Sequence, residues 1–416
     1  MIATLRNRNF FLLWSGGLIS MIGTWMLLTA LPFYIYSVTG SALATSGLLM
    51  AYVAPGVLLG SVAGVFVDRW DRKRVLVIGN LIQASIIPLL LLVDANGWIW
   101  LVYVVAFLES TVNQFLGPAE NALLPTLIDD EHLVSANSMN ALNDNLARIV
   151  GAALGGILLG TVGFRNVVLF DTVSFLVAAA LITFVVVQPA TRAAVSETAA
   201  NVSRWLQVWR EWIGGLRLVA EDNILRNLFI VIGVALFGDA ILSALLAVFA
   251  QDVAGFTATD FGWLLTARGV GGIVGGIVIA QLGPRLSNIV MIVGGLVLSG
   301  LAVLVMVIFP TLPVVMTLMI LAGPALMAWI ISMQTVLQQA TEDSFRGRVF
   351  GAYGTTSTVL MFVGAGLAGV MADSLGSSSL MASAAVIYVV AGLLGWVLLS
   401  KPLSQAAAPA ASQASP

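Results

Sequence analysis

The sequence predicts an all-α polytopic membrane protein whose twelve transmembrane helices form two pseudo-symmetric six-helix bundles. Of its 416 residues, 59% are hydrophobic and only 9% are charged, whereas soluble domains are about 45–50% apolar and about 25% charged. Apolar runs recur along the chain with roughly the 17–25 residues that a helix needs to cross about 30 Å of hydrocarbon. These runs are continuous, while the strands of a membrane β-barrel alternate polar and apolar residues.

Twelve runs are long enough to span a membrane, and the longest connection separates the sixth from the seventh. It divides the chain into an N-terminal bundle at 1–188, a cytoplasmic linker at 189–227, a C-terminal bundle at 228–400 and a tail at 401–416. The tail is rich in Ala, Ser, Gln and Pro, a composition that predicts disorder. The expected spans are about 11–36, 43–67, 75–93, 98–118, 139–162, 167–188, 228–250, 261–282, 289–309, 313–337, 349–372 and 380–400.

Basic residues are strongly biased to one side of the predicted helices. An even number of spans puts both termini on one side, and the arginines and lysines outside the spans lie in loops on that side, except Arg165. Cytoplasmic loops of membrane proteins are enriched in Lys and Arg. We therefore expect a multi-pass protein of the plasma (inner) membrane with both termini in the cytoplasm.

Two connections carry amphipathic patterns. In the linker, over 204–220, aromatic and aliphatic residues recur at helical spacing and charged residues occupy other positions. This pattern suits a helix that lies in the cytoplasmic membrane interface; a linker helix packed on the bundle fits it equally well. A second amphipathic stretch, 119–138, joins spans four and five.

A cluster of charge separates spans two and three. The run Gly64-x-x-x-Asp68-Arg69-x-x-Arg72-Lys73-Arg74 places four cations in a short turn. A weaker version of this run ends span eight, where Gly276 and Arg285 occupy similar places and Ala280 stands where the acid would be. Such internal repeats are typical of transporters built from homologous halves, with the substrate site near the middle of the bilayer.

These motifs resemble the major facilitator superfamily, whose signature loop lies between helices two and three. Asp71 stands where the general pattern has Gly, a replacement that is frequent in one exporter branch. Within that branch the chain is similar to enterobactin-exporter-like and macrolide-efflux-like proteins. The matching segments are Gly117-Pro118-Ala119, Leu124-Pro125, Ala136-Asn137, Asp171-Thr172-Val173-Ser174-Phe175 and Arg346-Gly347-Arg348-Val349-Phe350-Gly351.

The resemblance implies a secondary active exporter that works by alternating access and needs no cofactor. Its substrates would be amphipathic small molecules such as drugs, macrolides or siderophores, and its driving force an ion gradient, with protons as the first candidate. It also implies a monomer embedded in the lipid bilayer. Two other functions stay open: a lysophospholipid flippase or metabolite importer on the same fold, and a membrane sensor or scaffold that transports nothing.

The charged loop has a mechanical role in the resembling family. By that resemblance, Asp68 would dock on the start of span eleven near Gly347 and Arg348, and so latch the cytoplasmic side. A carboxylate is favourable at a helix N-terminus by about 0.3–1 kcal/mol when exposed. The gating set then comprises Gly64, Asp68, Arg69, Arg72, Lys73, Gly347 and Arg348. The alternative is a turn whose cations only fix the topology.

Span five contains closely spaced glycines. Gly151, Gly155 and Gly156 resemble the glycine-rich antiporter motif, although Ala152 replaces its usual Pro. Small residues also let helix backbones approach closely, without any role in coupling. Both interpretations stay open for these glycines.

Ionisable side chains inside spans are the candidates for coupling and substrate binding, because each costs at least about 2.5 kcal/mol at mid-span. Glu109 lies near the middle of span four and Asp239 near the middle of span seven. Burial favours the protonated form of a carboxyl group, so both are candidate proton sites; structural carboxyls are the alternative. Arg268 in span eight is placed to neutralise Asp239 or to contact an anionic substrate.

Further polar residues accompany these candidates. Asp144 and Arg148 lie four apart on one face of span five and are expected to pair. The uncharged candidates for the cavity wall are Asn113, Gln114 and Asn143. Asp171 lies near the outer end of span six, close to water, and is expected to be structural.

The composition argues against catalysis. Cysteine is absent, and neither lysine follows a Gly as a phosphate-binding loop requires. The single histidine, His132, follows three acidic residues in a loop and is expected to be a solvated residue. No metal site, enzyme activity or nucleic-acid partner is expected.

Overall fold

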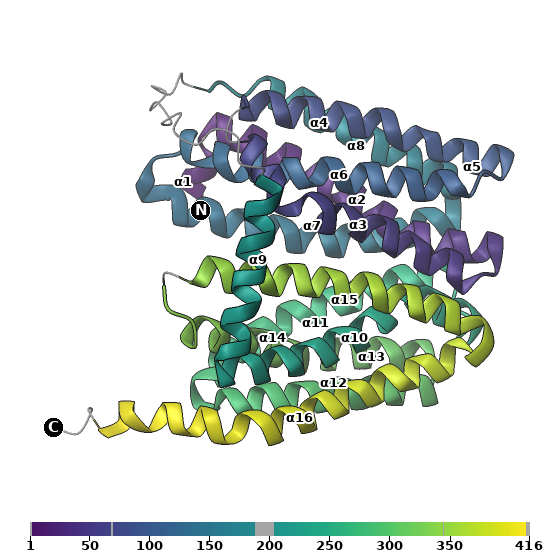
Figure 1. The fold of residues 1–416 in the computed structure, drawn as a ribbon. Helices are drawn as coiled ribbons and strands as arrows, with labels where there is room; N and C mark the ends of the chain where they lie inside the picture. The colour runs from purple at the N-terminus through teal and green to yellow at the C-terminus, as the bar shows by residue number, and fades with distance from the viewer. Residues whose placement is uncertain (1, 68–69, 188–203, 344, 413–416) are drawn as a thin grey trace. The chain divides into compact units, whose positions relative to one another are not determined.

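The computed structural model describes residues 2–67, 70–187, 204–343 and 345–412, and every regular element within these ranges is a helix. Figure 1 shows the helices in chain order, from the purple N-terminal segments to the yellow α16. The all-helical expectation is thereby confirmed.

The chain divides into two compact units. Unit 1 comprises Met1–Val202 and Phe256–Thr266, and unit 2 comprises Ser203–Gly255 and Ala267–Pro416. The earlier helices are α1 Ile2–Leu5, α2 Arg8–Thr39, α3 Ala42–Val67, α4 Arg72–Ile86, η1 Ile87–Leu90, α5 Leu91–Asn96, α6 Trp100–Leu123, η2 Leu124–Thr126, η3 Asp130–His132, α7 Leu133–Val162 and α8 Phe164–Thr183. The later ones are α9 Arg204–Glu221, α10 Asn223–Asp252, α11 Ala258–Leu282, η4 Gly283–Arg285, α12 Asn288–Ile308, α13 Leu312–Leu321, α14 Gly323–Gln339, α15 Arg346–Leu375 and α16 Ser377–Ser412.

Eleven helical runs in the described part of the chain are long and apolar enough to cross a membrane. The remaining expected span, the fourth, is α6, which falls outside that group. Its apolar sequence is interrupted by Glu109, Asn113 and Gln114. Polar groups are costly within hydrocarbon and usually face a cavity or a partner, so α6 is the helix where a functional site is most expected.

Among the described helices, α2, α4, α10 and α12 begin at side-chain caps. Asn7 Oδ1 accepts the backbone N–H groups of Asn9 at 3.0 Å and Phe10 at 3.2 Å, which starts α2. Asp71 accepts the backbone N–H of Arg74 at 2.9 Å and caps α4. A side-chain oxygen at this position satisfies a donor that the first helical turn leaves without a partner. Asp71 therefore ends the basic turn and fixes where α4 begins.

Unit 1 is held together by α2, α4 and α6. Helix α2 packs against α7 and α8, α4 packs against α6 and α8, and α3 packs against α6. Leu27 on α2, Ile87 on η1, Val105 on α6 and Val168 on α8 belong to one buried apolar cluster. This cluster fixes the positions of the helices that carry the polar residues of the unit.

Unit 2 is organised around α10 and α12. Helix α10 packs against α15 and α16, and α12 packs against α14 and α16. The linker helix α9 packs on α15, where a Cβ added to Gly215 would overlap the carbonyl group of Arg348. The structure thus shows α9 packed on the helices of unit 2, which agrees with the interpretation of the linker as a helix packed on the bundle.

Two boundaries differ from the sequence expectation. The tenth span is broken into α13, which ends at Leu321, and α14, which begins at Gly323; Pro324 follows, and proline lacks the N–H that a continuous helix needs. At the other boundary, α16 continues to Ser412, beyond the expected end of the twelfth span near residue 400; the disorder of the tail stays a prediction. Alanine, the strongest helix former, is frequent in this stretch. Residues 413–416 lie outside the described residues.

Candidate functional site

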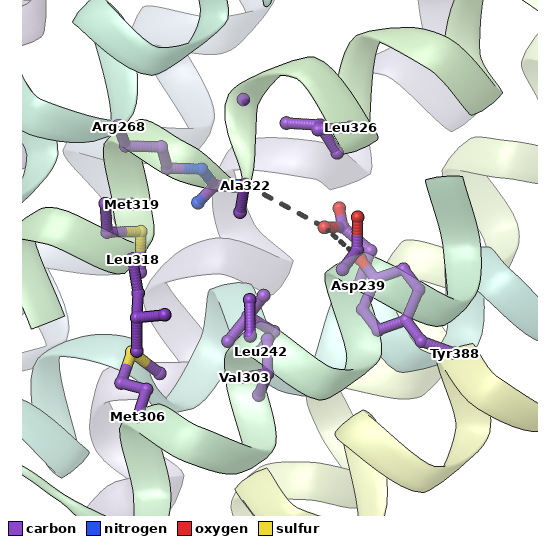
Figure 2. Close-up of a pocket in the computed structure, with 13 residues that line it drawn as sticks. Asp239, Leu242, Arg268, Val303, Met306, Leu318, Met319, Ala322, Leu326 and Tyr388 are labelled. Carbon is purple, nitrogen blue, oxygen red and sulfur yellow. Dashed lines mark hydrogen bonds and ion pairs between the residues drawn. The ribbon is translucent and has the colours of Figure 1, made fainter. Parts of the chain in front are cut away.

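Three polar side chains from three helices meet in unit 2, at what we call the aspartate site. The hydroxyl group of Tyr388 on α16 donates to Asp239 Oδ1 on α10 at 2.9 Å. Arg268 Nη2 on α11 lies 3.8 Å from the same oxygen. Figure 2 shows the guanidinium and hydroxyl groups directed toward the carboxylate. The predicted proximity of Arg268 and Asp239 is confirmed; Tyr388 was not foreseen.

The two partners hold Asp239 unequally. A charge-assisted N–H···O bond is about 2.7–2.9 Å long, so the 3.8 Å contact is an ion pair rather than a hydrogen bond. The Arg268 and Asp239 side chains are 33% and 22% exposed, whereas Tyr388 is buried. The hydroxyl group therefore fixes the carboxylate, and the guanidinium group has room to move.

The cavity at the aspartate site is small and largely apolar. It has a volume of about 60 Å³ and is lined by Leu242, Val303, Met306 and Leu326, among others. Drug-sized ligands occupy pockets of roughly 300–1,000 Å³, whereas a water molecule needs only about 10–15 Å³ of such space. In this conformation the site has room for water, not for a bulky substrate.

The break in the tenth span lies at this cavity. Ala322 and Gly323, between α13 and α14, both line it. A Cβ added to Gly323 would overlap the backbone of Gly271 on α11, one turn beyond Arg268. The interrupted helix thus lets α11 come close enough to bring Arg268 to Asp239. Irregular backbone at membrane depth is tolerated where it is buried in protein or lines a cavity.

Two carboxyl groups are buried in unit 1. Glu109 on α6 is 4% exposed and Asp171 on α8 is 0% exposed. Glu109 Oε1 and Asp171 Oδ2 have no hydrogen-bond partner within the described residues. Ser174 donates to Asp171 Oδ1 at 3.3 Å and to the backbone carbonyl of Asp171 at 2.7 Å.

The expectation that Asp171 lies close to water is wrong. Helix α8 begins at Phe164, so Asp171 lies two turns inside the helix. Gly23 on α2 leaves the space for it, because a Cβ added there would overlap Asp171 Oδ1 and Ser174 Oγ.

A larger cavity, which we call the amide cavity, lies in unit 1 between α2, α4, α6, α7 and α8. Its volume is about 340 Å³. Of the predicted residues, Asn113, Asn143 and Asp144 line it; Glu109, Gln114 and Arg148 are not among its lining residues. Gln114 follows Asn113 directly, so it points about 100° away around α6. The polar residues that line the cavity are Ser20, Thr24, Asn80, Gln83, Asn113, Glu120, Asn121, Asn140, Asn143 and Asp144.

Glu120 is the most informative residue that the sequence analysis missed. The stretch 119–138 was expected to be a connection, whereas α6 continues to Leu123 and α7 begins at Leu133. Glu109, Asn113 and Glu120 are then separated by four and seven residues, which are about one and two helical turns. The three side chains therefore lie on the same face of α6. This spacing of polar residues was a usable signal in the sequence. Asn140 Nδ2 lies 3.5 Å from Glu120 Oε1 and joins α7 to α6.

Asp144 and Arg148 share α7 as predicted. The contact described for Arg148 is from Nη2 to Asn145 Oδ1 at 3.4 Å. Their mutual pairing stays a prediction. Asp144 is exposed at the rim of the amide cavity.

The charged loop between α3 and α4 is described in part. Asp68 and Arg69 lie outside the described residues, so the predicted latch stays a prediction. Gly64 lies in the last turn of α3, and Arg72 opens α4. Lys73 Nζ donates to the carbonyl oxygen of Thr183 at the end of α8, at 2.8 Å. This bond ties the start of α4 to the end of α8 within unit 1.

The other part of the predicted gating set lies at the start of α15, in unit 2. The Arg348 guanidinium carbon lies 5.6 Å from the centre of the Phe345 ring, within the range of a cation–π contact. A Cβ added to Gly347 would meet open space.

The glycines of α7 lie where helices approach closely within unit 1. A Cβ added to Gly151 would lie 2.6 Å from the carbonyl oxygen of Ile22, and one added to Gly155 would overlap that of Met26. Gly156 faces Gly262 at the start of α11, where an added Cβ would lie 2.6 Å from the Gly262 Cα. These distances are those expected of small residues at a helix–helix contact.

Comparison with known proteins assigns the family. A family model described as transmembrane secretion effector matches residues 1–415. The chain belongs to this family of the major facilitator superfamily. The chain is 24% identical to Macrolide efflux protein A of Streptococcus pyogenes over 372 residues, an alignment that covers 88% of this chain and 90% of the relative. It is 27% identical over 368 residues to the multidrug efflux pump Tap of Mycolicibacterium fortuitum, covering 85% and 87%.

Solved structures show the same fold. The chain matches a mutant of the nucleoside transporter NupG with a TM-score of 0.75 and 13% identity, over 94% of this chain and 100% of the other. It matches a bacterial homologue of the iron transporter ferroportin with a TM-score of 0.72 and 18% identity, over 94% and 98%. The expectation of a major facilitator fold is confirmed, and the protein is a multi-pass membrane transporter of small molecules.

Proposed function

We propose that this protein is a secondary active exporter that uses the proton gradient to expel amphipathic small molecules. The aspartate site carries the proposal: Asp239, a carboxylate inside α10, has one hydrogen bond of 2.9 Å and one movable cationic partner at 3.8 Å. Relatives named for macrolide and multidrug efflux support the direction of transport. Drugs, macrolides and siderophores are the substrate classes that we propose.

Protonation of Asp239 would change the balance of charge at this site. An ionised Asp239 attracts Arg268 with an energy on the order of a few kcal/mol at an effective dielectric constant of about 20. A proton on the carboxyl group removes that attraction and leaves the guanidinium group in a cavity with apolar walls, which is unfavourable. Such a difference is enough to shift a conformational equilibrium at least about tenfold. The ion pair is thus a suitable element for coupling proton binding to alternating access.

The amide cavity is the part of unit 1 that we propose contacts substrate. Its volume of about 340 Å³ lies within the range of ligand pockets, unlike the small cavity at the aspartate site. Glu109 in α6 is a second candidate for proton binding. We further propose that the protein works as a monomer with both termini cytoplasmic, that Asp68 latches the cytoplasmic side, and that no chemical reaction is catalysed.

Proton movement tests the proposal directly. The purified protein is reconstituted into liposomes that contain a pH-sensitive dye, and a macrolide is added outside. We expect substrate-dependent proton flux for the wild type and none for Asp239→Asn. The matched control is Asp252→Asn, which makes the same change at an exposed position at the end of the same helix.

Three outcomes would contradict the proposal. Equal proton flux in wild type and Asp239→Asn would remove Asp239 from coupling. Transport of lysophospholipids in place of drugs would identify a flippase. Absence of any substrate-dependent flux, across drugs, siderophores and lipids, would favour a sensor or scaffold.

A further inference from the structure

The guanidinium group of Arg268 has unused hydrogen-bonding capacity. Arginine carries five N–H donors and keeps its positive charge in proteins. Within the described part of the chain, the polar contact of this group is the 3.8 Å ion pair with Asp239 Oδ1, which is too long for a hydrogen bond. The Arg268 side chain is 33% exposed and lines the small cavity of the aspartate site (Figure 2). Its donors are therefore accessible from that cavity.

The rest of the cavity offers little to these donors. Among its described lining residues, Asp239 is the acidic one and Arg268 the basic one; Ser299 and Tyr388 are polar without charge, and the others are apolar. The hydroxyl group of Tyr388 already donates to Asp239 Oδ1. A cation in such surroundings is costly unless it is paired. The charge of Asp239 therefore decides whether the guanidinium group is neutralised.

The other ionisable side chains around Asp239 do not supply a replacement charge. The two that interact with it are Tyr353 on α15 and Tyr388 on α16, and a tyrosine is uncharged near neutral pH. Helix α14 contains no ionisable residue. Helix α9 also packs on α10, and its Arg217 and Glu221 pair with each other at 2.9 Å. Within the described residues, the guanidinium group on α11 thus depends on one carboxylate.

We propose that the aspartate site binds a small monovalent anion, of the size and charge of chloride, on the guanidinium group of Arg268 when Asp239 is protonated. The proposal rests on the proposed proton-coupled export and adds the ion that replaces the charge of the carboxylate. Proton uptake removes the negative partner of Arg268, and the anion then supplies both a negative charge and an acceptor for the N–H groups. An ionised Asp239 repels the anion, so proton and anion favour each other's binding.

The size of the cavity favours a free inorganic anion over an anionic group of the transported molecule. Its volume is about 60 Å³, and a water molecule needs only about 10–15 Å³ of such space. A monatomic anion such as chloride is only somewhat larger than a water molecule, so it fits. A bulky organic anion does not fit in this conformation, since drug-sized ligands occupy roughly 300–1,000 Å³.

Chloride binding tests the proposal without any proton gradient. The full-length protein in phosphatidylcholine nanodiscs is titrated with chloride, and binding is measured from the broadening of the chloride NMR signal. Gluconate keeps the ionic strength constant, because salt screens charge interactions. We expect Asp239→Asn, which removes the competing negative charge, to bind chloride at least about tenfold more tightly than the wild type at neutral pH. Lower pH should tighten binding by the wild type and leave the variant unchanged.

Further substitutions locate the anion. Arg268→Gln alone would leave a carboxylate without its cation, so the double variant Asp239→Asn/Arg268→Gln, which removes both charges, is used instead. It should lose the tight binding. The matched control Asp239→Asn/Arg285→Gln, which changes an exposed arginine of η4 in the same unit, should bind as tightly as Asp239→Asn. Asp252→Asn, at an exposed position of α10, should behave as the wild type.

The nature of the anion gives a second measurement. Bromide should bind at least as well as chloride, and fluoride and sulfate more weakly, because strongly hydrated anions lose more on entering a cavity with apolar walls. Acetate is the test for a carboxylate ligand. Tighter binding of acetate than of chloride would overturn the proposal and identify the carboxylate of a substrate as the ligand.

The outcomes that overturn the anion site differ from those that overturn export. Equal chloride affinity of the wild type and Asp239→Asn would refute the site, and so would tight binding by Asp239→Asn/Arg268→Gln. If the variants bind chloride as expected but the wild type never moves protons with a substrate, the export function fails while the site stands. If substrate-dependent proton flux occurs and Asp239→Asn binds no chloride, the site fails while export stands.

Discussion

Removal of one hydroxyl group measures how strongly the aspartate site holds a charge. Tyr388 is 2% exposed and donates to Asp239 Oδ1 at 2.9 Å. Tyr388→Phe keeps the packed ring and deletes only this bond. A hydrogen bond to an ionised acceptor contributes about 1.5–3 kcal/mol, and one to a neutral acceptor about 0.5–1.5 kcal/mol. We therefore expect a loss of about 2 kcal/mol in the wild-type background and about 1 kcal/mol in the Asp239→Asn background.

The difference, about 1 kcal/mol, is a coupling energy that a double-mutant cycle isolates. The free energy of unfolding is measured in detergent micelles at neutral pH, with tryptophan fluorescence as the signal. Tyr103→Phe is the matched control, because its hydroxyl group donates to the neutral carbonyl of Ala44 at 3.1 Å in the other unit. That substitution should be additive with Asp239→Asn. Additivity within about 0.3 kcal/mol for Tyr388→Phe as well would refute an ionised Asp239.

Further substitutions test other parts of the account. Gly17→Met should fill the amide cavity and abolish substrate binding. Gly17→Ala should bind substrate normally, because its Cβ would have only ordinary contacts, at 3.6 and 3.7 Å. Equal binding by the two variants would place the substrate elsewhere. Glu109→Gln should lower the number of protons moved per substrate, measured by parallel flux assays, and an unchanged ratio would make Glu109 structural. Gly155→Ala should destabilise the fold by about 1–3 kcal/mol, because the added Cβ would overlap α2. Gly117→Ala is the control, because its Cβ would meet open space. Equal thermal stability of the two variants would show that α2 and α7 can separate freely.

The general architecture followed from composition and periodicity. Long apolar runs in a chain with 9% charged residues leave helical spans as the only common solution. The ends of the helices were less predictable, because polar residues inside a helix and polar residues in a connection look alike in one sequence. Glu120 shows the difficulty: its helix continues to Leu123, beyond the expected end of the span.

Partners across helices were predicted only where opposite charges identified them. Arg268 and Asp239 were matched because a cation and an anion in neighbouring spans are costly apart. Tyr388 lies 149 residues from Asp239 in sequence, and a tyrosine in a span is most often an interface residue. Asp171 was misplaced because its burial depends on the missing side chain of Gly23 in another helix. Such complementarity arises in three dimensions and leaves no periodic signal.

Gradient-driven accumulation of substrate tests coupling through Asp239 most directly. Proteoliposomes are loaded at one pH and diluted into another, without ATP, and the steady-state ratio of a macrolide inside to outside is measured. We predict a ratio well away from unity for wild type and Asp252→Asn, and a ratio of about one for Asp239→Asn, which should still exchange labelled for unlabelled macrolide. Equal accumulation by Asp239→Asn and wild type would contradict the account.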